Sequence, residues 1–240
     1  MKLLNWINIR LFLMLALVVF LYSFTSNRNS HRKLVKTEVI FVGNGDNFIS
    51  AKTVNKLLIE NNKDVQSIAK SDLNLNKIET SIDNNPMIEK SEVFVSIDGV
   101  VKALVKQKKP IARVFQGEVS FYIDYEGNTM PISEINTARV PVVLGVITSK
   151  NRKKITKVLR LIYDDTFLKK NIIGVEIDAN EDLKMANRSF NYQIEFGKMI
   201  NVEKKFKNYK AFFQKAVLDS SLYKYKKINL RFNQQVVCTK

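Results

Sequence analysis

The sequence predicts an α+β protein in which an N-terminal membrane-spanning helix precedes two folded domains. An apolar, uncharged segment from Leu11 to Asn27 predicts the helix. Short runs with period-two alternation, separated by segments with helical spacing, predict a mixture of sheet and helix. Pro110 follows one such run and has no N–H for a sheet ladder, so the sequence predicts a boundary between two sheets at this point.

The membrane-spanning helix needs more residues than its most apolar part supplies. Leu11 to Phe24 is short for a bilayer core of roughly 30 Å at about 1.5 Å per residue, so we expect the helix to begin at Ile7. Trp6 and Tyr22 then lie near the membrane interfaces. A cleaved signal peptide is the alternative, although Ser23-Phe24-Thr25 is a poor cleavage pattern. The predicted segments are a head at 1–10, a span at 7–26 and a linker at 27–36.

Charge alone does not fix the orientation of this helix. Lys2 and Arg10 precede its apolar part, whereas four basic residues follow it: Arg28, Arg32, Lys33 and Lys36. The positive-inside count therefore slightly favours an exported N-terminus, but the rule is weak for long domains and a short head readily stays in the cytoplasm. The same four residues lie where they can attract anionic lipid.

The composition argues against several classes of partner. A net charge of +16 is compatible with nucleic-acid binding, but the lysines are dispersed along the chain, which favours a solvated basic surface. Cys238 is the single cysteine, so neither an intramolecular disulfide nor a cysteine-based metal cluster can form. Gly43-Asn44-Gly45 lacks the other residues of a phosphate-binding loop and predicts a turn. We predict no cofactor, no metal, no nucleic acid and no small-molecule substrate.

The first folded domain, residues 37–109, has the pattern strand, helix, helix, strand, strand. Thr37 to Val42 is a β-branched and aromatic strand. Ser50 is expected to cap a first helix, and Asn76, answered by Glu79, a second one that ends before Pro86. A hairpin follows, with alternating residues on both sides of a predicted Asp98-Gly99 turn: Val93, Val95, Ile97, Val101, Ala103 and Val105.

The second domain, residues 110–240, is predicted to be β-rich with two helices. Residues at spacings of 3, 4 and 7 mark the first helix: Ile155, Val158, Leu159 and Ile162. Apolar residues on one face mark the second: Val202, Phe206, Tyr209, Phe213 and Val217. Strict alternation predicts a strand through Phe190, Tyr192, Ile194 and Phe196, and a final strand beginning at Ile228, Leu230 and Phe232.

No catalytic constellation is evident in the sequence. The single histidine, His31, adjoins the predicted span, where a catalytic triad or metal site has no folded support. Cys238 lies near the terminus and has no histidine close to it. The paired acids Asp164-Asp165 and Glu181-Asp182 fall at helix or turn boundaries, where capping explains them. We therefore predict a protein that is not an enzyme.

In this order of elements the chain resembles the bacterial division protein family FtsQ/DivIB over nearly its whole length. In that family a short cytoplasmic head and a single span precede a POTRA domain and a β-domain. Two positions depart from the family pattern, since Lys109 stands where arginine is common and Asn229 replaces a frequent aspartate. The matching segments are Val39–Gly43, Asn85–Val93, Val105–Arg113, Tyr122–Asp124 with Gly127, Val140–Gly145, Phe196-Gly197, Lys205-Phe206 and Ile228–Phe232.

The resemblance implies a non-enzymatic scaffold of the divisome that links early and late septal cell-wall proteins. Its expected partners are FtsB-like and FtsL-like coiled-coil proteins, and its expected location is the inner membrane at the septum, with both folded domains in the periplasm. Two alternatives are a membrane-anchored cell-wall-processing enzyme and a POTRA-type outer-membrane assembly component. An outer-membrane component is expected to show many further barrel strands.

Partner binding is expected at the C-terminal edge of the second domain, between Lys226 and Cys238. An edge strand presents backbone N–H and C=O groups that a partner strand can pair. The alternative is that the valines of this segment only complete the core. The predicted contacts are Tyr223, Tyr225, Leu230, Phe232, Val236 and Val237.

Overall fold

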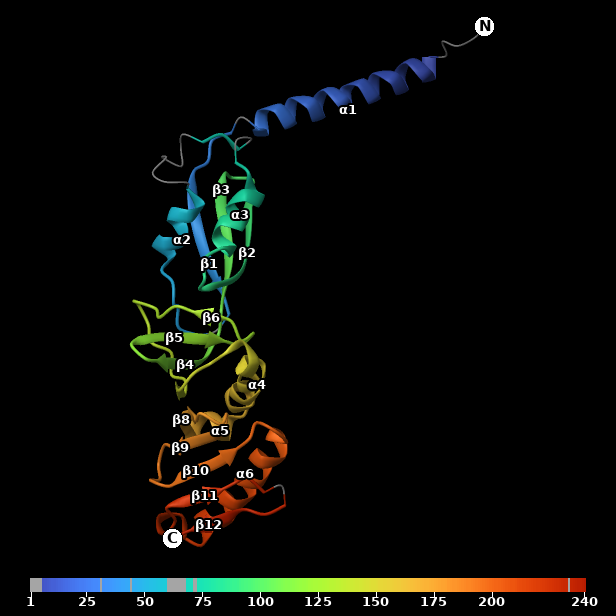
Figure 1. Ribbon diagram of the computed structural model, residues 1–240. Coiled ribbons are helices and arrows are strands. Elements are labelled where there is room, and N and C mark those ends of the chain that lie inside the picture. The colour runs from blue at the N-terminus through green and yellow to red at the C-terminus, as the bar shows by residue number, and fades with distance from the viewer. Residues whose placement is uncertain (1–5, 31, 44, 60–67, 71–72, 233) are drawn as a thin grey trace. The chain divides into compact units, whose positions relative to one another are not determined.

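The computed structural model describes residues 6–240 except 31, 44, 60–67, 71–72 and 233. It divides the chain into two compact units, residues 1–107 and 108–240 (Figure 1). Strand β3 ends at Gln107 and β4 begins at Pro110. The sheet therefore changes at the proline, whereas the domain limits 37–109 and 110–240 stay a prediction. His31 lies outside the described residues.

Helix α1, Trp6–Ser30, is the N-terminal apolar helix. Its 25 residues measure about 37 Å at 1.5 Å per residue, which exceeds a bilayer core of about 30 Å. Among the described residues, one helix is long and apolar enough to cross a membrane, by length and composition. It extends beyond the predicted span of 7–26 at both ends.

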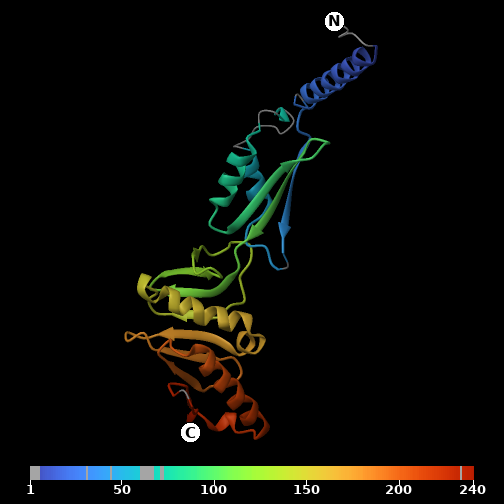
Figure 2. The same cartoon turned by 90° about the vertical axis from the view of Figure 1, so that its right-hand side faces the viewer.

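The first unit contains a three-stranded sheet of order β1-β3-β2, formed by Lys36–Val42, Val100–Gln107 and Ile88–Val95. Strand β1 is parallel to β3, and β2 is antiparallel to it. Helices α2, Ala51–Leu58, and α3, Leu75–Asp83, cover one face of the sheet (Figure 2). The POTRA-like order β-α-α-β-β predicted from the sequence is thereby confirmed.

Capping residues fix where these two helices begin. Ser50 caps α2 as predicted, because its Oγ accepts a hydrogen bond from the Thr53 N–H at 3.0 Å. The predicted cap of α3 was wrong: the helix starts earlier, and Asn74 Oδ1 accepts from the Lys77 N–H at 3.0 Å. Glu79 is then free to accept from the Val93 N–H of β2 at 2.6 Å, which ties the helix to the sheet.

The hairpin between β2 and β3 is longer than the predicted two-residue turn. Pairing ends at Val95 and Val101, and Gly99, at φ 84°, donates its N–H to the Ser96 carbonyl at 3.1 Å. Ile97 was expected on the buried face of a strand, but it is 84% exposed. The prediction was wrong because Ile97 lies in the loop, beyond the last strand pair.

The second unit contains a nine-stranded sheet of order β12-β11-β10-β9-β8-β7-β4-β5-β6. Helices α4, Ser149–Asp164, and α6, Val202–Leu218, pack on one face of this sheet (Figures 1 and 2). The short helix α5, Thr166–Asn171, and the 3-10 turn η3, Leu222–Lys224, complete the unit. The strands are β4 Pro110–Gln116, β5 Val119–Asp124, β6 Thr129–Met130, β7 Val142–Leu144, β8 Ile172–Ile177, β9 Leu183–Asn187, β10 Gln193–Gly197, β11 Lys227–Asn229 and β12 Val237–Thr239.

The mixed α+β architecture of this unit agrees with the prediction, but three details differ. Helix α5 was missed, and Asp165 explains it, because its Oδ1 accepts from the Phe167 and Leu168 N–H groups at 3.0 Å. Val217 was predicted on the buried face of α6 but is exposed, since Ala216, seven residues after Tyr209, occupies that face. The predicted final strand is divided into two strands, β11 and β12.

Candidate partner-binding edge of the second sheet

Strand β12 forms one edge of the nine-stranded sheet. It pairs antiparallel with β11, which in turn pairs parallel with β10. The predicted single strand divides because Asn229 Oδ1 accepts from the Arg231 N–H at 2.9 Å, a local turn that takes the chain out of the sheet. Strand β11 is consequently an interior strand, and β12 presents the edge at this end of the sheet.

Backbone direction shows which groups of β12 point outward. The Leu230 N–H donates to the Glu195 carbonyl of β10, and the Gln193 N–H donates to the Lys226 carbonyl, both at 2.9 Å. The backbone N–H and C=O of Ile228 therefore face β10, and those of Lys227 and Asn229 face β12. The Lys226 N–H, just before the strand, donates to the Thr239 carbonyl at 2.8 Å. The partners of Lys227 and Asn229 in β12 are Thr239 and Val237, so the backbone N–H and C=O of Cys238 point away from the sheet.

The side chains of the edge segment alternate between the core and the open face. Val236 and Cys238 are half-buried against the core, whereas Val237, 40% exposed, and Thr239 lie on the opposite, open face of the sheet. Burial raises the pKa of the Cys238 thiol, so the thiolate is scarcer than for an ordinary cysteine at neutral pH. Cys238 therefore offers a partner its backbone rather than a reactive sulfur.

The open face beside the edge carries two rows of side chains that run across the strands. Residues that pair across neighbouring strands point their side chains to the same face of the sheet. Along each strand they alternate with residues that point into the core, such as Val175, Met185 and Ile194. One row contains Leu144, Glu176, Lys184, Glu195, Asn229 and Val237. The other contains Val142, Gly174, Ala186, Gln193, Lys227 and Thr239.

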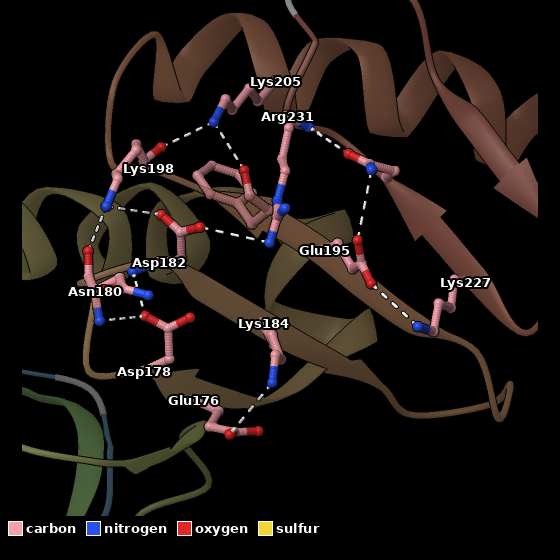
Figure 3. Close-up of polar contacts among 12 residues, drawn as sticks. Glu176, Asp178, Asn180, Asp182, Lys184, Glu195, Lys198, Lys205, Lys227 and Arg231 are labelled. Carbon is pink, nitrogen blue, oxygen red and sulfur yellow. Dashed lines mark hydrogen bonds and ion pairs between the residues drawn. The ribbon is translucent and has the colours of Figure 1, made fainter.

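The charged side chains of the first row, Glu176, Lys184 and Glu195, alternate in sign, and Lys227 of the second row lies beside Glu195 (Figure 3). Lys184 Nζ lies 3.8 Å from Glu176 Oε1, and Lys227 Nζ lies 3.5 Å from Glu195 Oε1. Asn229 Nδ2 donates to Glu195 Oε2 at 3.5 Å. An aspartate at position 229 would place two carboxylates side by side, so asparagine suits the neighbouring Glu195. Gly174 and Ala186 of the second row line a groove of about 410 Å³, together with Phe190.

A second polar cluster fixes the end of β10 (Figure 3). Asp182 lies between Lys198 and Arg231, with N–O distances of 3.1 and 3.4 Å. Lys205 of α6 is buried, and its Nζ donates to the carbonyls of Phe196 and Lys198, both at 2.8 Å. Burial lowers the pKa of the Lys205 ammonium. The cluster thus binds α6 and the segment after β11 to the sheet that carries the edge.

The sequence of the second unit matches the family model described as FtsQ/DivIB, C-terminal related, over residues 109–239. The chain belongs to this family. Residues 39–106 also match a POTRA-like domain. Among curated proteins no match was found. A solved structure, the major extracytoplasmic domain of the trans isomer of the bacterial cell division protein DivIB from Geobacillus stearothermophilus, aligns with 13% identity and a TM-score of 0.30, over 47% of this chain and 95% of that one.

The predicted contact residues of this FtsQ/DivIB-related chain occupy different environments. Tyr223 is 82% exposed, with its ring 5.1 Å from that of Phe190. Tyr225 is half-buried, and its ring lies 5.8 Å from that of Phe212. Leu230 is 1% exposed, so its side chain belongs to the core. Their role in binding stays a prediction.

The remaining predicted contacts lie at and before the edge of the FtsQ/DivIB-related unit. Phe232 is exposed after the turn at Asn229, whereas Val236 and Val237 lie on opposite faces of the edge segment. Thr239, Lys227 and Glu195 line the same open face but were missed. Only the pairing of strands distant in sequence brings them together, so no local pattern signals them.

Two acidic residues of the second unit, Asp124 and Asp165, have structural partners. Asp124 Oδ1 accepts from the Asn128 N–H at 2.7 Å, and Asp165 caps α5. In the part of the chain that the structure describes, no three His, Cys, Asp or Glu side chains form a group that could hold a metal ion. FtsQ/DivIB-related proteins are generally non-enzymatic division proteins.

Replacing Lys205 by methionine should lower the free energy of unfolding by about 2 kcal/mol, because two buried carbonyls lose their donor while the side-chain volume is kept. Urea unfolding of the full chain in detergent measures the change. Lys207→Met is the matched control, since Lys207 lies on the exposed side of the same helix. Equal stability of the two variants would show that Lys205 does not hold the end of β10.

Proposed function

We propose that this chain is a non-enzymatic divisome scaffold that binds FtsB-like and FtsL-like coiled-coil partners by addition of a partner strand to β12. Its place is the inner membrane at the septum, with the head in the cytoplasm and both folded domains in the periplasm, where it links early and late septal cell-wall proteins. Membership of the FtsQ/DivIB-related family and the N-terminal apolar helix support this proposal.

The outward-facing backbone of Cys238 is the observation that carries the binding mode. A partner strand that pairs there extends the sheet, and the side chains of the partner continue the two rows of the open face. Val237 favours an apolar neighbour. The exposed lysines around the edge, Lys224, Lys226, Lys227 and Lys240, favour an acidic one.

Truncation after Asn233 tests the location of the site. Loss of β12 should weaken binding of a soluble FtsB-like and FtsL-like coiled-coil complex about tenfold. Binding should not be abolished, because β11 becomes a new edge with which the partner strand can pair. Binding to the full chain in nanodiscs, by biolayer interferometry, measures the affinity. The circular dichroism spectrum and the thermal unfolding midpoint show whether the truncated chain is folded. A folded truncated chain with unchanged affinity would refute the assignment.

A further inference from the structure

The membrane-proximal end of the first unit exposes two large apolar side chains. Ile97, in the loop 96–99 between β2 and β3, is 84% exposed, and Val35, just before β1, is 53% exposed. The hairpin tip is the name used for this loop, residues 96–99, together with the neighbouring segment 32–36. Exposed apolar residues beside basic ones are typical of surfaces that enter a lipid interface.

Hydrogen bonds hold the two segments of the hairpin tip together. Arg32 Nη1 donates to the Ile97 carbonyl at 3.3 Å, and the Val35 N–H donates to the Gly99 carbonyl at 2.8 Å. The Lys70 N–H donates to the Arg32 carbonyl at 2.9 Å, which adds a third segment. Ile97 is therefore kept beside the residues that connect the unit to α1.

The charge of the hairpin tip is positive. Arg32, Lys33 and Lys36 are exposed, and Lys70 is half-exposed beside them. Asp98 is the acidic residue of the tip, and its pKa is lowered, first by a hydrogen bond with Ser96 and further by its own backbone and by Lys102 and Lys36. It is ionised at neutral pH and offsets one of the four positive charges. The remaining charge suits an anionic surface.

Chain length keeps the hairpin tip near the membrane whatever the orientation of the unit. Helix α1 ends at Ser30, and Leu34 is already buried in the core of the first unit. Four residues of fully extended chain span at most about 14 Å. The hairpin tip is consequently confined to the neighbourhood of the lipid headgroups.

We propose that the hairpin tip binds the anionic lipid leaflet into which α1 is anchored. Ile97 enters the interface between headgroups and acyl chains, while Arg32, Lys33 and Lys36 contact lipid phosphates. The binding orients the first unit on the membrane. It shares with the proposed function the role of α1 as a membrane anchor, but it does not require a partner at β12. Loss of lipid binding and loss of partner binding are therefore distinguishable outcomes.

A tryptophan at the hairpin tip tests this proposal. The single native tryptophan is Trp6, so Ile97→Trp in a Trp6→Phe background gives one reporter in the full chain. In nanodiscs containing phosphatidylglycerol, brominated acyl chains should quench its fluorescence about twofold, with a shift of the emission to shorter wavelength. In phosphatidylcholine alone the quenching should largely disappear.

Val42→Trp in the same background is the matched control. Val42 is also exposed and lies at the other end of β1, about 20 Å from Lys36 at 3.3 Å per residue, so it should remain unquenched. Reversing two charges, Lys33→Glu with Lys36→Glu, should reduce quenching of the Ile97→Trp reporter to the phosphatidylcholine level. An unquenched reporter at 97, equal quenching at 42 and 97, or no dependence on anionic lipid and on these charges would each overturn the proposal.

Discussion

Replacing Cys238 by proline should lower the affinity for a coiled-coil partner about a hundredfold, whereas Cys238→Ala should leave it within about threefold. The N–H of Cys238 points away from β11, so proline removes a donor that only a partner strand uses. The lost hydrogen bond costs about 1 kcal/mol, and the ring keeps the partner backbone from its normal distance, which weakens the neighbouring bonds as well. A total of about 2.8 kcal/mol corresponds to a hundredfold change.

The structure also explains why this substitution leaves the fold intact. Val237 and Thr239 keep the N–H groups that face β11, and proline is tolerated at outward-facing positions of edge strands. Val237, as the residue before proline, is biased toward the extended conformation that it already has. Cys238→Ala retains the donor but loses the half-buried sulfur, so it separates the effect of packing from that of the backbone.

Biolayer interferometry with each variant in nanodiscs gives the affinities, and thermal unfolding shows that both variants remain folded. Equal binding of Cys238→Pro and Cys238→Ala would exclude strand addition at β12. A loss shared by both variants would place the contribution of Cys238 in its side chain.

Elements with a strong local pattern could be predicted from the sequence. The alternation predicted through Phe190, Tyr192, Ile194 and Phe196 marks β10, although the strand begins only at Gln193. The spacing of Ile155, Val158 and Leu159 marks α4. Strand β12 has three residues and no alternation before it, so it carries no comparable signal. Its existence depends on pairing with β11, after a turn that a single side chain, Asn229, imposes.

The sequence placed the candidate edge between Lys226 and Cys238, where the structure has β11 and β12, but it did not indicate which backbone atoms face outward. Aromatic and apolar composition drew attention to Tyr223, Leu230 and Val237, yet one of these is buried. The proposed binding mode depends on the outward direction of one backbone N–H, which follows from the register of three strands. Register between strands as distant in sequence as β10 and β11 cannot be read from alternation alone.

Replacing Gly145 by alanine should destabilise the second unit by about 3–5 kcal/mol, a large part of the stability of an ordinary domain. Gly145 follows β7 at φ 112°, a conformation that costs an L-residue about 1–2 kcal/mol. A Cβ at this position would lie 2.5 Å from the Ile177 carbonyl oxygen and 3.1 Å from Ile177 Cβ. Ile177 ends β8 and pairs with Leu183, so its backbone cannot yield without disturbing the centre of the sheet.

Gly117→Ala separates backbone conformation from this steric overlap. Gly117 also has a positive φ, 63°, but nothing lies within 4 Å of an added Cβ, so we expect a loss of only about 1 kcal/mol. Urea unfolding of the full chain, followed by circular dichroism, reports the opening of the second unit. The midpoint should fall much further for Gly145→Ala than for Gly117→Ala. Equal midpoints would mean that β7 does not approach the end of β8 as closely as this geometry requires. The strand register that defines the two rows leading to β12 would then also be wrong.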